Sequence, residues 1–231
     1  MTAKKFWIYS LFIFLVTVGS FDGLYAQSTE EKIPKVLVIG DSISLGYTPV
    51  LQGMLYQQVD IVRPTTRGGG WINCQGTKLG ATKIVEWLSK DDFDVIHFNF
   101  GLHDLKHVHP ETGKNSEDPA HPQQANIEEY ENNLRAIVAK LKATDAKLIF
   151  ATTTPYPDTP GGPLRRSDQP AKYNEVAIQI MKENKVRVND LYALVLPKMK
   201  EMLMPNNVHF RRSANLDLAN QVANEIRSAL K

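Results

Sequence analysis

The sequence predicts a three-layer α/β/α fold, in which helices cover both faces of a parallel sheet of five strands. Three observations support this fold class. Short apolar runs recur along the chain, amphipathic stretches separate them, and polar segments follow them. Strands that are apolar throughout are typical of sheets buried on both faces, and the helices between them form the right-handed crossovers that parallel strands need.

The apolar runs predict strands at 36–39, 59–62, 95–100, 148–151 and, more weakly, 186–188. Between them the clearest helix is predicted over residues 127–141, where apolar side chains recur every three or four positions. The last helix shows the same spacing through Leu218, Val222 and Ile226. Ligands of open parallel sheets bind beyond the carboxyl ends of the strands, so we expect the chemistry in the loops that follow the apolar runs.

Composition excludes several functions. The 231 residues are 42% hydrophobic and 23% charged, which is typical of one globular domain. The net charge of +2 is small and evenly spread, so we expect no nucleic-acid partner. The single cysteine, Cys74, cannot form an internal disulfide, and the fold must therefore be held by its core.

The first residues have the pattern of a secretory signal peptide. Lys4 and Lys5 precede an apolar stretch over 6–18, and Ala26 offers a small residue for cleavage. The stretch is shorter than the roughly 20 residues that cross a bilayer, which makes a permanent anchor the less favoured alternative. We expect a signal peptide over 1–26 and a secreted or periplasmic domain over 27–231, with no stable membrane anchor after cleavage.

A nucleophile is predicted at Ser42. The segment Gly40-Asp41-Ser42 follows the first apolar run and opens a helix, where unpaired N–H groups stabilise a developing oxyanion. The alternative is that Ser42 only caps this helix. A nucleophilic serine needs a base, and His209 near the end of the chain can supply it.

Three blocks in order carry a family resemblance: Gly40-Asp41-Ser42, then Gly101-Leu102-His103-Asp104, then Val208-His209 before the last helix. From residue 35 to its end, the chain resembles the SGNH (GDSL-type) hydrolases. The resemblance implies a flavodoxin-like sandwich and a serine esterase. It also implies an oxyanion hole made by the serine amide, a second-block glycine amide and a third-block asparagine side chain. We expect no cofactor and no metal.

Carried onto this chain, the resemblance makes Ser42 the nucleophile and His209 the base. Gly76 is the preferred second-block glycine, because Gly76-Thr77 opens a helix and leaves an amide free to face an oxyanion. The glycine run 68–70 is the alternative, and it can equally form a flexible turn.

Two positions depart from the family pattern. His103 replaces the third-block asparagine; its ring N–H can donate to an oxyanion, more strongly if the ring is protonated, or it can only cap the next segment. Asn206 stands where an aspartate is expected, three residues before His209. A backbone carbonyl could then orient His209, another carboxylate (Asp104 or Asp190) could do so, or hydrolysis has been lost. Asp190 could equally cap a helix.

The predicted loops are polar and offer possible substrate contacts: Arg63, Arg67, Trp71, Asn73, Asp104, Tyr156, Arg165 and Arg166. Aromatic faces and hydrogen-bonding side chains suit a sugar, and arginines suit carboxylate or sulfate groups on it. We therefore expect a carbohydrate esterase that removes acetyl or other small acyl groups from a small-molecule or oligosaccharide ester. The alternatives are a lysophospholipase or thioesterase of the same family, and an inactive carbohydrate-binding protein.

Four further histidines have simpler interpretations. His107, His109 and His121 lie in the polar segment 106–124, but no cysteine or carboxylate cluster completes a metal site, so we expect a long loop over the active site. His97 lies inside the third apolar run, and we expect a core histidine whose polar atoms are satisfied.

Overall fold

The computed structural model describes residues 32–158 and 160–231. The predicted signal peptide over 1–26 lies outside this part of the chain. None of the helices in the described part combines the length and the apolar character needed to span a membrane.

The predicted fold class is confirmed. The five strands of the sheet are β1 (Lys35–Ile39), β2 (Asp60–Val62), β3 (Val95–Phe98), β4 (Lys147–Ala151) and β5 (Arg187–Asn189). All pairs are parallel and the order is β2-β1-β3-β4-β5. The strand that follows β1 in sequence, β2, lies on one side of it, and the next strand, β3, lies on the other side. The strand order therefore reverses between β1 and β3, and ligands of such sheets bind at this switch point.

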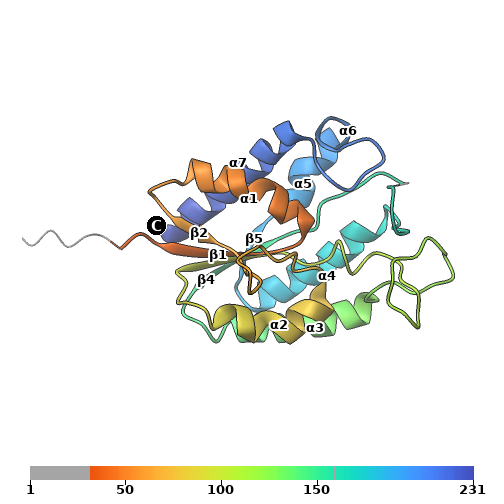
Figure 1. The fold of residues 1–231 in the computed structure, drawn as a ribbon, viewed down its shortest axis with the longest axis horizontal. Coiled ribbons are helices and arrows are strands. Elements are labelled where there is room, and N and C mark those ends of the chain that lie inside the picture. Colours follow the sequence, from red (N-terminus) through yellow and green to blue (C-terminus); the bar gives the residue numbers. More distant parts are fainter. Residues whose placement is uncertain (1–31, 159) are drawn as a thin grey trace, which may run out of the picture. The chain divides into compact units, whose positions relative to one another are not determined.

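Helices form the two outer layers. They are α1 (Ser42–Met54), α2 (Thr77–Leu88), α3 (Ile127–Leu141), α4 (Gln169–Glu183), α5 (Leu191–Val195), α6 (Met199–Met202) and α7 (Arg212–Leu230), with the 3₁₀ turn η1 (Leu196–Lys198) before α6. Figure 1 shows α1 and α7 on one face of the sheet and α2, α3 and α4 on the other. Helix α3 has the predicted bounds, and its apolar stripe is buried.

The third strand is shorter than predicted, and its end positions the site. Strand β3 stops at Phe98. Beyond it the side-chain amide of Asn99 donates to the carbonyl of Ala151, 2.7 Å away, and the chain then turns at Gly101. Gly101 has φ +150°, and a Cβ there would lie 2.0 Å from Thr153 Oγ1. Only glycine permits this close approach between the segments that follow β3 and β4.

His97 is a core histidine, although only one of its ring nitrogens has a partner. Nε2 lies 3.2 Å from Asn189 Nδ2, and Nδ1 has no hydrogen bond to the described residues. Burial lowers the pKa of His97 to about 4, so the ring is neutral in the core.

Candidate active site

Ser42 is the first residue of α1, and the cap of this helix is Asp41, not the serine. Asp41 Oδ1 accepts the N–H of Ile43 at 2.9 Å, which leaves the Ser42 hydroxyl available for other contacts. That hydroxyl lies 2.8 Å from Nε2 of His209. The two residues are 167 positions apart in sequence, and the fold brings them to hydrogen-bond distance.

His209 is oriented by Asn207. Its backbone N–H donates to Asn207 Oδ1 at 3.0 Å, which shows that the oxygen of this amide faces the histidine. The same oxygen lies 2.8 Å from ring atom Nδ1. Because an oxygen can only accept, Nδ1 carries the proton, and Nε2 keeps a lone pair for the Ser42 hydroxyl. This is the tautomer that a general base requires.

The structure places Asn207, instead of Asn206, at the ring nitrogen. Asn206 has φ +49°, and its carbonyl accepts the N–H of Gly161 at 2.6 Å. The left-handed turn at Asn206 redirects the chain, so the following side chain meets the imidazole. Sequence reasoning missed Asn207, because the family spacing pointed to its neighbour.

Neither carboxylate considered in its place lies at His209. Asp190 caps α5, accepting from Ala193 N and Thr152 Oγ1, both at 3.0 Å. Asp104 is fully buried and accepts from the backbone N–H and the hydroxyl of Thr77, at 2.8 and 2.6 Å. The expectation that Asp104 contacts substrate is wrong, because its side chain is 0% exposed and is used to fix the start of α2.

Gly76 is the N-cap of α2 and lies against Asp104. A Cβ on Gly76 would come 2.7 Å from Gln124 Nε2 and 2.8 Å from Asp104 Oδ1, so a larger residue would displace one of them. Burial raises the pKa of Asp104 to about 6, against the opposing effect of the Thr77 hydrogen bonds. The alternative glycines at 68–70 lie in an exposed turn that Thr66 N closes on Gly70 O at 2.8 Å.

His103 lies close to His209 in a neutral form. Burial lowers its pKa to about 3, and the positive charges of Lys106 and Arg165 act in the same direction. His103 is therefore neutral near neutral pH, and the protonated ring, which would be the stronger oxyanion donor, is excluded. Its Nδ1 is buried without a partner among the described residues. A neutral ring with an unpartnered Nδ1 favours the proton on Nε2, as a donor.

If this N–H stabilises the oxyanion, His103→Ala is expected to lower kcat about 10²-fold. His103→Asn restores an amide donor, so its loss of kcat is expected to be smaller. Steady-state kinetics on p-nitrophenyl acetate measure both variants. Equal losses of kcat in the two would contradict a donor role.

Arg63 holds the turn that carries the nucleophile. Its guanidinium donates to Gly40 O at 2.9 Å and to Ser44 Oγ at 2.8 Å, and it lies 5.9 Å from the centre of the Trp71 ring. It is buried, and so are Arg165 and Tyr156, whose hydroxyl donates to Arg166 O at 3.2 Å. The structure buries all three side chains among the loops around the site, where their hydrogen bonds support these loops. The sequence places Arg63 directly after β2, but nothing in it indicates that this side chain supports the turn before Ser42.

The other expected substrate contacts stay near the surface. Trp71 is 37% exposed and Arg67 is exposed. Asn73 is partly buried, and its Oδ1 accepts the N–H of Gln75 at 3.0 Å, which shapes the turn that leads to Gly76.

Arg165 affects the base directly. Its Nε donates to Leu102 O at 3.1 Å, beside His103. Burial lowers the pKa of His209 from its ordinary value, and the charge of Arg165 adds to this effect. A base must be neutral, so the acid limb of the kcat/KM profile is expected at lower pH than the ordinary pKa of histidine would place it. Arg165→Gln removes the charge, which should raise this pKa and move the acid limb to higher pH. An unchanged pH profile would contradict the contribution of Arg165.

Comparison with known proteins agrees with the fold. The model of the GDSL-like lipase/acylhydrolase family matches residues 38–214. No curated protein sequence matches the chain.

Solved structures with similar folds include an acetyl xylan esterase, AlAXEase, with a TM-score of 0.65 and 16% identity over 83% of this chain and 99% of that one. A lipase/acylhydrolase from Enterococcus faecalis has a TM-score of 0.66 and 17% identity, covering 84% and 96%. An acetylxylan esterase from Geobacillus stearothermophilus has a TM-score of 0.65 and 20% identity, also covering 84% and 96%. The family match extends over most of the chain. The chain therefore belongs to the GDSL-like lipase/acylhydrolase family, and it is a carboxylic ester hydrolase.

Proposed function

We propose that the chain is an exported serine esterase that removes acetyl or other small acyl groups from a carbohydrate. The observation that carries the proposal is the contact of Ser42 Oγ with His209 Nε2 at 2.8 Å, with the ring held in the productive tautomer by Asn207. A helix cap alone would not need a histidine at this distance.

In the acylation step Ser42 Oγ attacks the ester carbonyl carbon while its proton moves to His209 Nε2. The carbonyl oxygen becomes an oxyanion that accepts from Ser42 N–H, Gly76 N–H and the ring N–H of His103. Collapse of this intermediate breaks the bond to the sugar oxygen, which takes the proton from His209. Water then attacks the acyl-enzyme by the same route, releasing the carboxylic acid and restoring the Ser42 hydroxyl.

Asn207 is a positioning residue in this scheme. Its oxygen keeps the proton on Nδ1 throughout the cycle. An amide cannot offset the imidazolium charge as an aspartate does. The geometry thus supports a working pair of Ser42 and His209 with reduced electrostatic assistance. It argues against loss of hydrolysis as the reason for the missing aspartate.

A carbohydrate ester is favoured by two observations. Structures with the same fold include acetyl xylan esterases, and Trp71, a 37% exposed aromatic ring, lies 5.9 Å from the guanidinium of Arg63, which holds the turn before Ser42. Planar rings and hydrogen-bonding groups suit sugars. Export rests on the signal-peptide pattern of residues 1–26.

Active-site labelling tests the chemistry. A fluorophosphonate probe is expected to modify Ser42, as read by mass spectrometry of the peptide, and to abolish hydrolysis of p-nitrophenyl acetate. Acetate release from acetylated xylan, compared with turnover of a lysophospholipid and an acyl-thioester, tests the substrate class. Labelling at another residue would overturn the mechanism. Faster turnover of the lysophospholipid or the thioester would overturn the carbohydrate assignment.

A further inference from the structure

A cavity lies between the start of α2 and the loop 106–124, and Gln75, the residue before Gly76, is part of its lining. Its volume is about 590 Å³, within the range of roughly 300–1,000 Å³ for small-molecule sites. We name it the amide cleft. The polar side chains that line it include five amides and bases, Gln75, Lys78, His109, Gln123 and Gln124, together with Thr82, Asn126 and Glu129.

We propose that the amide cleft binds the neutral sugar units that neighbour the acylated sugar of an oligosaccharide substrate. The inference rests on the proposed function, because it assigns the place of the glycan whose ester Ser42 cleaves. No residue of the cleft takes part in the catalytic steps described above.

The cleft adjoins Gly76, the glycine proposed above as an oxyanion donor. Gln75 directly precedes Gly76, and Gln124 Nε2 is the atom that a Cβ on Gly76 would approach most closely, at 2.7 Å. A substrate whose carbonyl oxygen accepts from Gly76 N–H therefore has the cleft beside it. The remainder of a chain-like substrate can extend from the ester into this space.

The lining has the chemistry of a sugar site. Each amide side chain carries a donor and an acceptor, which match neighbouring hydroxyl groups on a sugar ring. Leu79, Val108 and Pro122 add apolar surface for the C–H face of the ring. Lys78 and Glu129 are the lysine and the carboxylate of the lining, so their formal charges cancel. This balance favours a neutral ligand.

Two of the amides are already oriented by the fold. Gln123 Oε1 accepts the Tyr173 hydroxyl at 3.0 Å, which leaves its NH₂ as the donor. Asn126 Oδ1 accepts the N–H of Glu129 at 2.9 Å as the cap of α3, which likewise leaves its NH₂. Oriented donors bind hydroxyl oxygens without first losing rotamer freedom.

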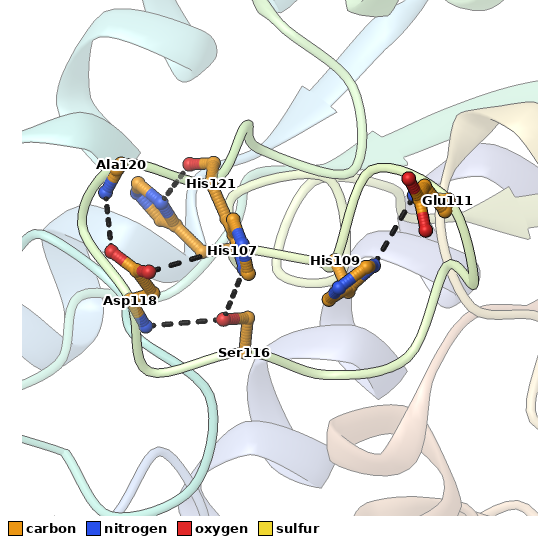
Figure 2. A network of polar contacts seen from close by, with 7 residues as sticks. All are labelled: His107, His109, Glu111, Ser116, Asp118, Ala120 and His121. Carbon is orange, nitrogen blue, oxygen red and sulfur yellow. Dashed lines mark hydrogen bonds and ion pairs between the residues drawn. The ribbon is translucent and has the colours of Figure 1, made fainter.

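The loop wall is held in place by its own hydrogen bonds. His107 N donates to Leu164 O, and Gln124 N donates to Lys106 O, at 2.9 and 2.8 Å. Figure 2 shows His107, Ser116 and His121 gathered within the loop, where His107 Nδ1 donates to His121 O at 2.6 Å. The His109 ring packs edge-on against His121, with 4.8 Å between ring centroids.

A hydrogen bond within the loop also fixes which ring nitrogen of His109 carries the proton. Glu111 N–H donates to His109 Nδ1 at 3.2 Å, so the ring proton of a neutral His109 lies on Nε2. The loop that was expected to lie over the active site is thus an ordered wall of the cleft. Since the wall is preformed, ligand binding does not carry the entropy loss of ordering a long loop.

The experiment compares acetylated xylotriose with acetylated methyl xyloside. We expect kcat/KM to be about tenfold higher for the trisaccharide, through a lower KM, as one or two added hydrogen bonds would produce. His109→Ala and Lys78→Ala, one from each wall, should each reduce this ratio about threefold or more. Lys182→Ala, an exposed lysine on α4 away from the cleft, is the matched control and should keep the ratio.

Direct binding separates failure of the cleft from failure of the proposed function. Calorimetry of Ser42→Ala with unacetylated xylotriose, cellotriose and mannotriose measures sugar binding to the cleft in the absence of turnover. Binding that is weakened by His109→Ala supports the cleft even if no sugar ester is hydrolysed. Cleavage of acetylated xylotriose with no length advantage, and no binding of the three trisaccharides, would overturn the cleft and leave the esterase standing.

Discussion

Replacement of Ser42 by alanine is expected to lower kcat for ester hydrolysis by about 10⁴-fold or more, because the attacking oxygen is removed. Ser42 Oγ is the atom that contacts His209 Nε2, and Asp41 carries the helix cap. The fold should therefore tolerate the change. Hydrolysis of p-nitrophenyl acetate measures kcat, and thermal unfolding checks that the variant is folded.

Ser213→Ala is the matched control for this variant, because Ser213 is an exposed serine near the start of another helix, α7. It should retain the rate of the unmodified enzyme. Substantial ester turnover by Ser42→Ala, with Ser42 also unlabelled by fluorophosphonate, would show that another group is the nucleophile.

Substitution of Asn207 gives the second large effect. Asn207→Leu removes the acceptor from Nδ1, and the base is no longer held in the productive tautomer; kcat should fall by about 10² to 10³-fold. Asn207→Asp keeps the acceptor and adds a charge that offsets the imidazolium, so kcat should rise by about 10 to 10²-fold. This gain is smaller than the 10⁴-fold loss known for aspartate-to-asparagine changes in serine proteases, because the tautomer here is already correct.

Asn206→Asp is the control for this pair, since it makes the same charge change one residue away. Asn206 has φ +49°, a conformation that aspartate tolerates, and its carbonyl bonds to Gly161. We expect little change in kcat. A gain in Asn206→Asp without one in Asn207→Asp would mean that the ring of His209 is oriented differently in solution. Assays at pH 8, above the acid limb expected for the unmodified enzyme, compare the variants.

Much of this protein could be read from local patterns in its sequence. The apolar runs marked all five strands, and the spacing of apolar residues marked α3 with its bounds. These features are readable because periodicity and burial are linked within a few residues of chain. The serine at the end of the first strand and the late histidine were also identifiable, because strand ends in a parallel sheet converge on one edge.

Other features depended on contacts between distant segments. Asp104, Tyr156, Arg63 and Arg165 are polar residues in loops, and their burial follows from the segments that pack over them. The neutral state of His103 likewise depends on its burial and on the charges of Lys106 and Arg165. Sequence spacing carries no information about such packing.

The sequence by itself determined the fold class, the family and the nucleophile and base candidates, because each depends on local periodicity or on the order of short blocks. Only the tertiary structure decided that Asn207 meets the imidazole, since one left-handed residue at Asn206 changes which side chain faces the ring. It alone also formed the amide cleft, whose walls come from α2 and the loop 106–124. A cavity is a property of how segments pack, and a chain carries no local sign of it.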